Sequence, residues 1–205
     1  MPVHKTTVLD LLRHGEPVGG HRYRGKHDDP LSANGWQQMQ AAVAEHHPWQ
    51  AIVSSPLLRC RAFAEALSVR HNLPCLLDDR LMEIGFGDWE GLTADEVEQA
   101  QPGALLRFYA DPITHAPLGA EPLTDFQRRI DAVWQDLLQC HAGRHVLVVC
   151  HAGVIRMMLA LVLELPFSSL FRIKVSHGGM TRLQCDDDGN GAPYCQLLFH
   201  GGFVG

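Results

Sequence analysis

The chain has 205 residues, of which 46% are hydrophobic and 20% charged, and its formal net charge is -6. This length fits one domain, or a core domain with a modest insertion, and it buries about 70% of the unfolded surface without needing disulfides or metals. The composition excludes wholesale disorder, and the acidic balance argues against a nucleic acid or an anionic membrane as partner.

The first half of the chain alternates short apolar runs with helical patterns. Strands are expected at residues 7–12, 51–53 and 74–77, and helices at 32–45 and 55–69. Pro56 is placed in the first turn of the second helix. Glycines between residues 15 and 25 mark a loop after the first strand.

The second half begins with a weaker pattern at residues 93–121, where three prolines interrupt short helical pieces and a fourth, Pro122, follows. That composition is typical of a flap inserted over a pocket. A helix follows at 124–139, with Thr124 as its expected N-cap, and then a strand at 146–149 and a helix at 154–163. Late strands are expected at 180–185 and 194–199.

This alternation predicts an α/β fold, a three-layer α/β/α sandwich whose mostly parallel sheet is covered on both faces. We expect one domain over residues 1–205, with the flap at about 93–121. No apolar run reaches the roughly 18 residues of a membrane helix, and no signal peptide is expected at the N-terminus.

The six cysteines include no C-x-x-C pair, and they are interpreted as reduced, buried thiols of a cytoplasmic protein. The 13 histidines include no H-E-x-x-H motif and no zinc-finger spacing, so no metal site is predicted from them. The adjacent pair His46 and His47 is interpreted as a solvated helix end.

Two of the expected strands end in a similar way, with Leu12-Arg13-His14-Gly15 and with Cys150-His151-Ala152-Gly153. Sheets of this kind bind ligands beyond the carboxyl ends of their strands. If the two strands are neighbours, the two histidines face each other across a gap the size of a phosphate. Alone, either tripeptide is better explained by a capping role.

The residue types around this gap suit phosphoryl chemistry. A neutral imidazole is a good nucleophile near pH 7, and an arginine fork such as that of Arg13 binds phosphate. Arg59, near the start of the second helix, adds a second cation at a helix N-terminus, although alone it would be interpreted as a surface residue paired with an acid. A carboxylic acid must protonate the leaving oxygen, and Glu83 is the preferred candidate over Asp88 and Glu90. An ion pair between Glu83 and Arg80 remains open as an alternative.

Taken together, four blocks resemble the histidine phosphatase superfamily, the phosphoglycerate mutase-like group: residues 13–16, 55–59, 83–91 and 150–153. The blocks keep the family's order from Leu9 to about Leu183. Within the superfamily, residues 9–16, 86–91, 119–126 and 175–178 are most similar to the α-ribazole-5′-phosphate phosphatases of cobalamin biosynthesis.

The resemblance implies roles for individual residues. His14 would form a phosphohistidine, Glu83 would donate the proton, and Arg13, Arg59 and His151 would hold the phosphoryl oxygens. The loop that contains Arg24 and Gly25 would face the substrate, and the Ala152 amide would donate to it. No metal or other cofactor would be required, and the partner would be a small phosphate ester.

The chain departs from the family pattern after Glu16. Many members have Thr or Ser there and an Asn a few residues later, whereas this chain has Pro17, then Val18, two glycines and His21, with no Asn before Asn34. His21 or the glycine amides are expected to substitute for the missing side chain.

Five functions are weighed on this basis. A phosphatase of α-ribazole 5′-phosphate is favoured, with a mutase-type phosphotransferase or a broad-specificity sugar-phosphate phosphatase as the enzymatic alternatives. A non-catalytic phosphate-binding module and a histidine-rich metal-binding protein are the alternatives outside catalysis.

Overall fold

The computed structural model describes residues 5–44 and 47–202. Within these ranges the centre of the fold is a six-stranded sheet in the order β3-β2-β4-β1-β5-β6. The first four strands of that order are parallel to one another, and β5 and β6 add an antiparallel edge. The strands are β1 Lys5–Arg13, β2 Ala51–Ser54, β3 Cys75–Leu77, β4 His145–Cys150, β5 Met180–Asp187 and β6 Tyr194–Gly202.

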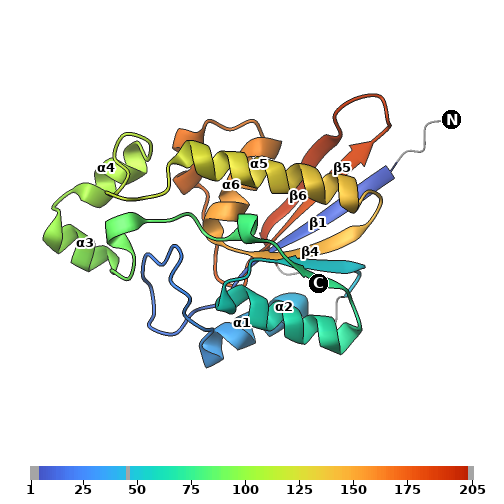
Figure 1. The fold of residues 1–205 in the computed structure, drawn as a ribbon, viewed down its shortest axis with the longest axis horizontal. Helices are drawn as coiled ribbons and strands as arrows, with labels where there is room; N and C mark the ends of the chain where they lie inside the picture. Colours follow the sequence, from blue (N-terminus) through green and yellow to red (C-terminus); the bar gives the residue numbers. More distant parts are fainter. Residues whose placement is uncertain (1–4, 45–46, 203–205) are drawn as a thin grey trace.

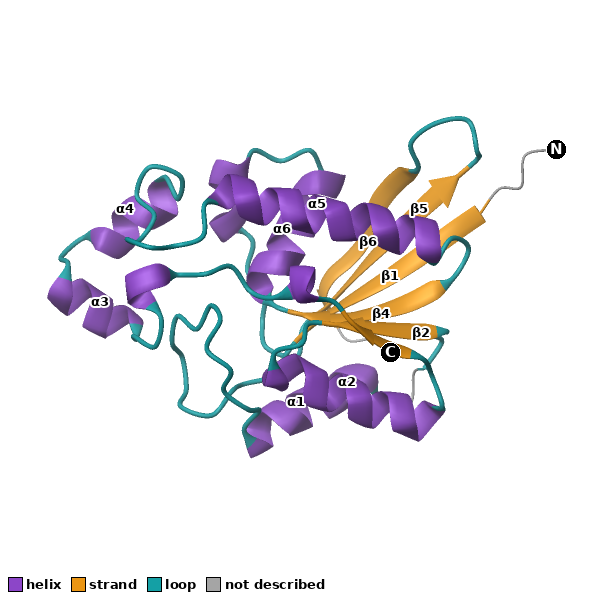
Figure 2. Cartoon of the chain, viewed as in Figure 1, coloured by secondary structure: helices purple, strands orange, loops and turns teal. Residues whose placement is uncertain are grey.

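Helices cover both faces of the sheet, as the sequence predicts. Figure 1 shows α5 and α6 over one face, α1 and α2 over the other, and α3 and α4 beyond the sheet. The helices are α1 Ala33–Val43, α2 Leu58–His71, α3 Ala94–Ala100, α4 Ala104–Ala110, α5 Leu123–Cys140 and α6 Ala152–Val162, with short 3₁₀ turns η1 Asp79–Leu81, η2 Gly87–Trp89 and η3 Phe167–Arg172. The loop after β1 lies at the same end of the sheet as α3 and α4, the two helices within residues 93–121 (Figure 2).

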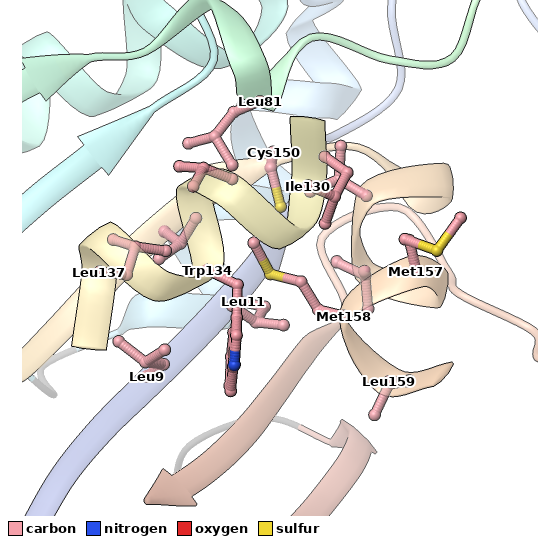
Figure 3. Close-up of a cluster of buried hydrophobic side chains, with 14 of the residues drawn as sticks. Leu9, Leu11, Leu81, Ile130, Trp134, Leu137, Cys150, Met157, Met158 and Leu159 are labelled. Atoms are coloured by element: carbon pink, nitrogen blue, oxygen red, sulfur yellow. The ribbon is translucent and has the colours of Figure 1, made fainter. Parts of the chain in front are cut away.

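Alternation along the central strands divides the apolar core into two layers. Leu9 and Leu11 of β1 pack toward α5 and α6 (Figure 3), whereas Leu12 packs toward α1 and α2. β4 is apolar at consecutive positions because helices cover both of its faces. On α5, one face of the helix is apolar and buried, at Phe126, Ile130, Val133, Trp134 and Leu137.

The structure corrects two of the predicted helix starts. The amide of Ser55 still donates to the Val149 carbonyl, at 3.0 Å, so the chain is extended there and α2 begins only at Leu58. Pro56 therefore precedes the helix. α5 begins at Leu123, after Pro122, and Thr124 lies inside its first turn without capping it.

The structure shows where the first predicted helix begins and where it ends. Ser32 caps α1 by accepting a hydrogen bond from the Gly35 amide, and the helix ends at Val43. Glu45 and His46, where the solvated helix end was predicted, lie outside the described residues. His47 is exposed, and its ring stacks on that of His71 with centroids 4.7 Å apart.

The prediction of six reduced, buried thiols is wrong in two respects. Cys185 and Cys195 form a disulfide, because they lie directly opposite each other on the antiparallel strands β5 and β6, with Cα atoms 4.1 Å apart. Cys140 is exposed at the end of α5 and Cys75 is only partly buried on the edge strand β3. Cys60 and Cys150 are free and buried, as expected.

A buried carboxylate ties the middle of β1 to its neighbours. Asp10 is fully buried, and it accepts hydrogen bonds from Arg182 at 2.7 and 2.9 Å, from Trp49 at 2.8 Å and from His145 at 2.9 Å. Burial alone would raise the pKa of Asp10, but these hydrogen bonds outweigh burial and lower its pKa to about 2. The network joins β1, β4 and β5 to the segment before β2.

We predict that Asp10→Asn lowers the free energy of unfolding at pH 7 by roughly 2 to 4 kcal/mol, because it removes the buried negative charge that accepts hydrogen bonds from Arg182, Trp49 and His145. The folded pKa is depressed, so this stabilisation is complete above the unfolded pKa of about 3.9 and is lost as pH falls through about 2. Denaturant unfolding of the wild type and of Asp10→Asn should show that the difference between their free energies of unfolding decreases as the pH is lowered from 7 to 2. Asp131→Asn, at an exposed position of α5, is the control; an equal loss there would contradict the role of Asp10.

Candidate active site

The two predicted strand ends do meet. β1 and β4 are parallel neighbours, with Arg13 opposite Cys150, and the His14 amide continues the ladder by donating to the Cys150 carbonyl at 3.0 Å. The rings of His14 and His151 lie edge to face with centroids 5.1 Å apart. The prediction that these strands are neighbours is confirmed.

His14 is held in one orientation by its own loop. Nδ1 lies 2.7 Å from the Gly15 carbonyl, which can only accept, so Nδ1 carries the proton and Nε2 keeps its lone pair. A Cβ on Gly15 would collide with the backbone of Gly35 in α1, so the close approach of these two segments requires glycine. Burial, His151, Arg13 and Arg59 hold the pKa of His14 well below its usual range. The ring is therefore a neutral base and nucleophile at pH 7.

Arg13 is fixed by a histidine that the sequence analysis did not assign to the site. Its guanidinium donates to the Val175 carbonyl at 2.5 Å and to Nε2 of His177 at 2.9 Å. His177 must accept this bond with an unprotonated nitrogen, and burial followed by the charge of Arg13 lowers its pKa to about 3. His21 stacks on His177, at 5.4 Å between centroids, and lines the cavity.

Arg59 enters the site from the first turn of α2. It is 1% exposed, and it donates to the carbonyls of His27 and, at 2.9 Å, Gly25 in the loop after β1. Gly25 has a φ of 49°, and a Cβ there would collide with the carboxylate of Glu90. The conformation of this loop therefore places two backbone carbonyl groups against the Arg59 guanidinium.

Arg24 braces the same loop. Its side chain is buried, paired with Asp29 at 2.8 Å and bonded to the Val18 carbonyl at 2.8 Å, although it also lines the cavity. Asn34, the nearest asparagine along the chain, donates to Glu16 and is not among the cavity-lining residues.

His151 lies behind the cavity wall. It is fully buried and does not line the cavity, and its Nε2 lies 2.7 Å from the Ser55 hydroxyl. Burial, Arg59 and Arg13 lower its pKa well below the usual range. Ala152, the first residue of α6, does line the cavity beside it.

Glu83 reaches the cavity, whereas the other candidate acids do not. Its carboxylate accepts the Gly153 amide at 3.1 and 3.2 Å, and a Cβ on Gly153 would collide with it. Asp88 is exposed, and Glu90 accepts from the Phe86 amide, at 2.9 Å. Neither lines the cavity.

The alternative of an ion pair between Glu83 and Arg80 is wrong. Arg80 instead pairs with Asp78 and Asp136, at 2.7 Å each. The backbone of the Glu83 segment is held by Arg129 of α5, which donates to the carbonyls of Arg80, Met82 and Glu83.

These residues surround a cavity of about 300 Å³. Its inner end presents Arg13, His14, Arg59 and Glu83, and its outer wall carries a set of aromatic side chains with two further arginines. The hydroxyls of Tyr23 and Tyr109 lie 2.6 Å apart, so the loop after β1 contacts the flap helix α4 there. The outer wall consists of Tyr23, Phe86, Tyr109, Phe171, Arg22 and Arg156.

The inner end is equipped to bind a tetrahedral dianion and to transfer it. Two buried cations can hold its oxygens, a neutral imidazole can attack its phosphorus, and a carboxyl group can exchange a proton. Across residues 5–44 and 47–202, no cluster of three metal-ligating side chains is found, and no helix is long and apolar enough to cross a membrane.

The chain is similar to known proteins over most of its length. The family description for the histidine phosphatase superfamily (branch 1) matches residues 9–194. A glucosyl-3-phosphoglycerate phosphatase of Mycolicibacterium vanbaalenii is 36% identical over 170 residues, which cover 77% of this chain and 75% of that one. The chain spans about half the length of the first curated relatives that it matches, at 51%.

Solved structures agree with this match. A mycobacterial glucosyl-3-phosphoglycerate phosphatase superposes with a TM-score of 0.84 at 29% identity, over 96% of this chain and 99% of the other. The α-ribazole phosphatase of Shigella flexneri superposes with a TM-score of 0.80 over 95% and 96% of the two chains. Its identity of 23% means that this second likeness shows the fold alone.

We predict that the His14 imidazole stays neutral as the pH is lowered through about 6.5, the ordinary pKa of histidine, because burial and neighbouring cations depress its pKa. Histidine-selective NMR of the apoprotein measures this directly, with the His14 resonance identified by its absence from the His14→Gln spectrum. An inflection of that resonance near pH 6.5 would contradict the proposed electrostatics.

Proposed function

The chain belongs to the histidine phosphatase superfamily, and on that premise we propose that it hydrolyses phosphate monoesters through a phosphohistidine on His14. One observation carries the proposal. The His14 ring is buried, is oriented by the Gly15 carbonyl with Nε2 free, and shares the cavity wall with Arg13 and Arg59.

In the first step, Nε2 of His14 attacks the phosphorus and the bond from phosphorus to the ester oxygen breaks. Arg13 and Arg59 bind the equatorial oxygens and stabilise the charge that they carry in the transition state. Glu83 gives its proton to the departing oxygen, so the alcohol leaves neutral. His151 lies behind His14 and outside the cavity. Through its contact with the Ser55 hydroxyl it helps to hold the side chains around His14 in position.

In the second step, the ionised Glu83 accepts a proton from a water molecule. The hydroxide that forms attacks the phosphohistidine in line with Nε2, the nitrogen–phosphorus bond breaks, and inorganic phosphate leaves. His14 is again neutral and Glu83 again carries its proton, so the cycle is balanced.

The proposal extends to the chemical identity of the leaving group. The aromatic outer wall supports a leaving group that contains a ring, and α-ribazole 5′-phosphate, with its aromatic base, is one such substrate. Glucosyl-3-phosphoglycerate is the second candidate, because a phosphatase named for it is 36% identical to this chain. Comparing kcat/KM for the two esters distinguishes them, and an assay for conversion of 3- to 2-phosphoglycerate identifies a mutase instead.

The first functional prediction is that His14→Ala abolishes both turnover and covalent labelling by a ³²P-labelled ester. The label on the wild-type protein should be lost in acid and retained in base, as expected for a phosphoramidate. Circular dichroism and thermal melting control for folding. Residual turnover at a comparable rate would exclude His14 as the nucleophile.

The second functional prediction concerns leaving-group basicity. Glu83→Gln should reduce kcat by about 10²- to 10⁴-fold on a sugar phosphate, whose alkoxide leaves badly without a proton. The reduction on p-nitrophenyl phosphate should be much smaller, because nitrophenolate needs no proton. Asp88→Asn, which changes an exposed acid outside the cavity, serves as the control. Equal losses on both esters would show that Glu83 only positions its neighbours.

A further inference from the structure

Five arginines line the cavity, and only two of them are paired with a carboxylate. Arg22 pairs with Glu96 at 3.2 Å and Arg24 with Asp29 at 2.8 Å. Throughout the described part of the chain, the remaining three arginines have no carboxylate within 4.0 Å. These three are Arg13, Arg59 and Arg156.

The charge of a phosphate monoester accounts for two of the three. Arg13 and Arg59 lie at the inner end with His14, where a dianion would neutralise both. His14 and His151 add no positive charge there, because burial and the neighbouring arginines lower the pKa of both rings well below the usual range. A third positive charge therefore remains on the cavity wall after the phosphate is bound.

Arg156 is held in place for a ligand beyond the phosphate. It projects from the second turn of α6, its Nε donates to the Ile173 carbonyl at 2.9 Å, and its guanidinium lies 5.3 Å from the centre of the Phe171 ring. These contacts fix the plane of the guanidinium and use only Nε. Neither terminal nitrogen has a hydrogen-bond partner within residues 5–44 and 47–202. A desolvated guanidinium with two unused nitrogens matches the fork geometry of a carboxylate.

Its neighbours place Arg156 between the inner end of the cavity and the outer wall. It interacts electrostatically with Glu83, which serves the ester oxygen, with Arg13 of the inner end, and with Tyr109, which belongs to the outer wall. The Phe171 ring beneath it is also part of that wall. An anion bound by Arg156 would thus lie only a few bonds from the ester oxygen.

We propose that Arg156 binds a carboxylate on the leaving group, so that the preferred substrates are phosphate esters of hydroxy acids. This inference rests on the proposed phosphatase function and narrows it. α-Ribazole 5′-phosphate is then disfavoured, because its leaving group carries no anion that could pair with Arg156. A hydroxy acid that also bears a sugar ring would use both Arg156 and the aromatic wall.

A matched pair of substrates tests the proposal. 3-Phosphoglycerate and glycerol 3-phosphate share a three-carbon skeleton and differ in a carboxylate against a hydroxymethyl group. Arg156→Gln should lower kcat/KM for 3-phosphoglycerate by roughly 30- to 100-fold, the range for a charge-assisted contact, and change that for glycerol 3-phosphate and p-nitrophenyl phosphate less than about threefold. Arg156→Lys should restore part of the preference, and Arg128→Gln, on the exposed face of α5, should leave all three values unchanged.

Two outcomes would overturn the assignment: equal losses on all three esters, which would place Arg156 in the shared phosphate site, or no loss on any of them. A binding measurement separates this result from the proposed function. Calorimetric titration of the His14→Gln protein, with and without Arg156→Gln, compares affinities for 3-phosphoglycerate and glycerol 3-phosphate without turnover. If the wild type hydrolyses no ester, the proposed function fails. The binding contrast then still decides whether Arg156 recognises the carboxylate.

Discussion

The parallel pairing of β1 with β4 is the constraint on which the rest of the site depends. Residues 8–13 and 145–150 run in register, and the last rung of the ladder joins the His14 amide to the Cys150 carbonyl. A shift of one residue would turn His14 away from His151 and would expose the apolar faces that both strands bury. The packing that stabilises the sheet thereby also sets the distance between the two histidines.

Burial then gives these groups their chemistry. The chain as a whole is acidic, yet Arg13, Arg59 and Arg156 meet at one cavity together with His14, which burial keeps neutral. Among the described residues none of these three arginines forms a salt bridge, and each is held by backbone carbonyl groups, those of Val175, His27, Gly25 and Ile173. Carbonyl dipoles orient a guanidinium without cancelling its charge, so the positive potential remains available to an anionic ligand.

Much of this arrangement could be predicted from the sequence because its signals are local. The histidine at the end of each of the two strands can be recognised in the sequence. The alternation of strands and helices along the chain predicts the parallel sheet that aligns the two strand ends. Arg156 was missed because it lies within the apolar helix α6, although one arginine in such a run is itself a signal of a functional contact. His177 and the disulfide between Cys185 and Cys195 depend on which late segments pair, and that pairing is set by tertiary packing.

The hydrogen bond between Tyr23 and Tyr109 has a consequence for how such a protein can diversify. It joins two segments that are 86 residues apart in the chain, and neither contributes a strand to the sheet. This part of the outer end is therefore supported by the loop after β1 and by α4, whereas Arg13 and His14 of the inner end lie at the end of β1 in the central sheet. Insertions or substitutions in α3 and α4 can reshape the outer end while the inner end keeps its geometry. Related proteins can in this way differ in the leaving group that they bind at the outer end and keep the same phosphoryl chemistry at the inner end.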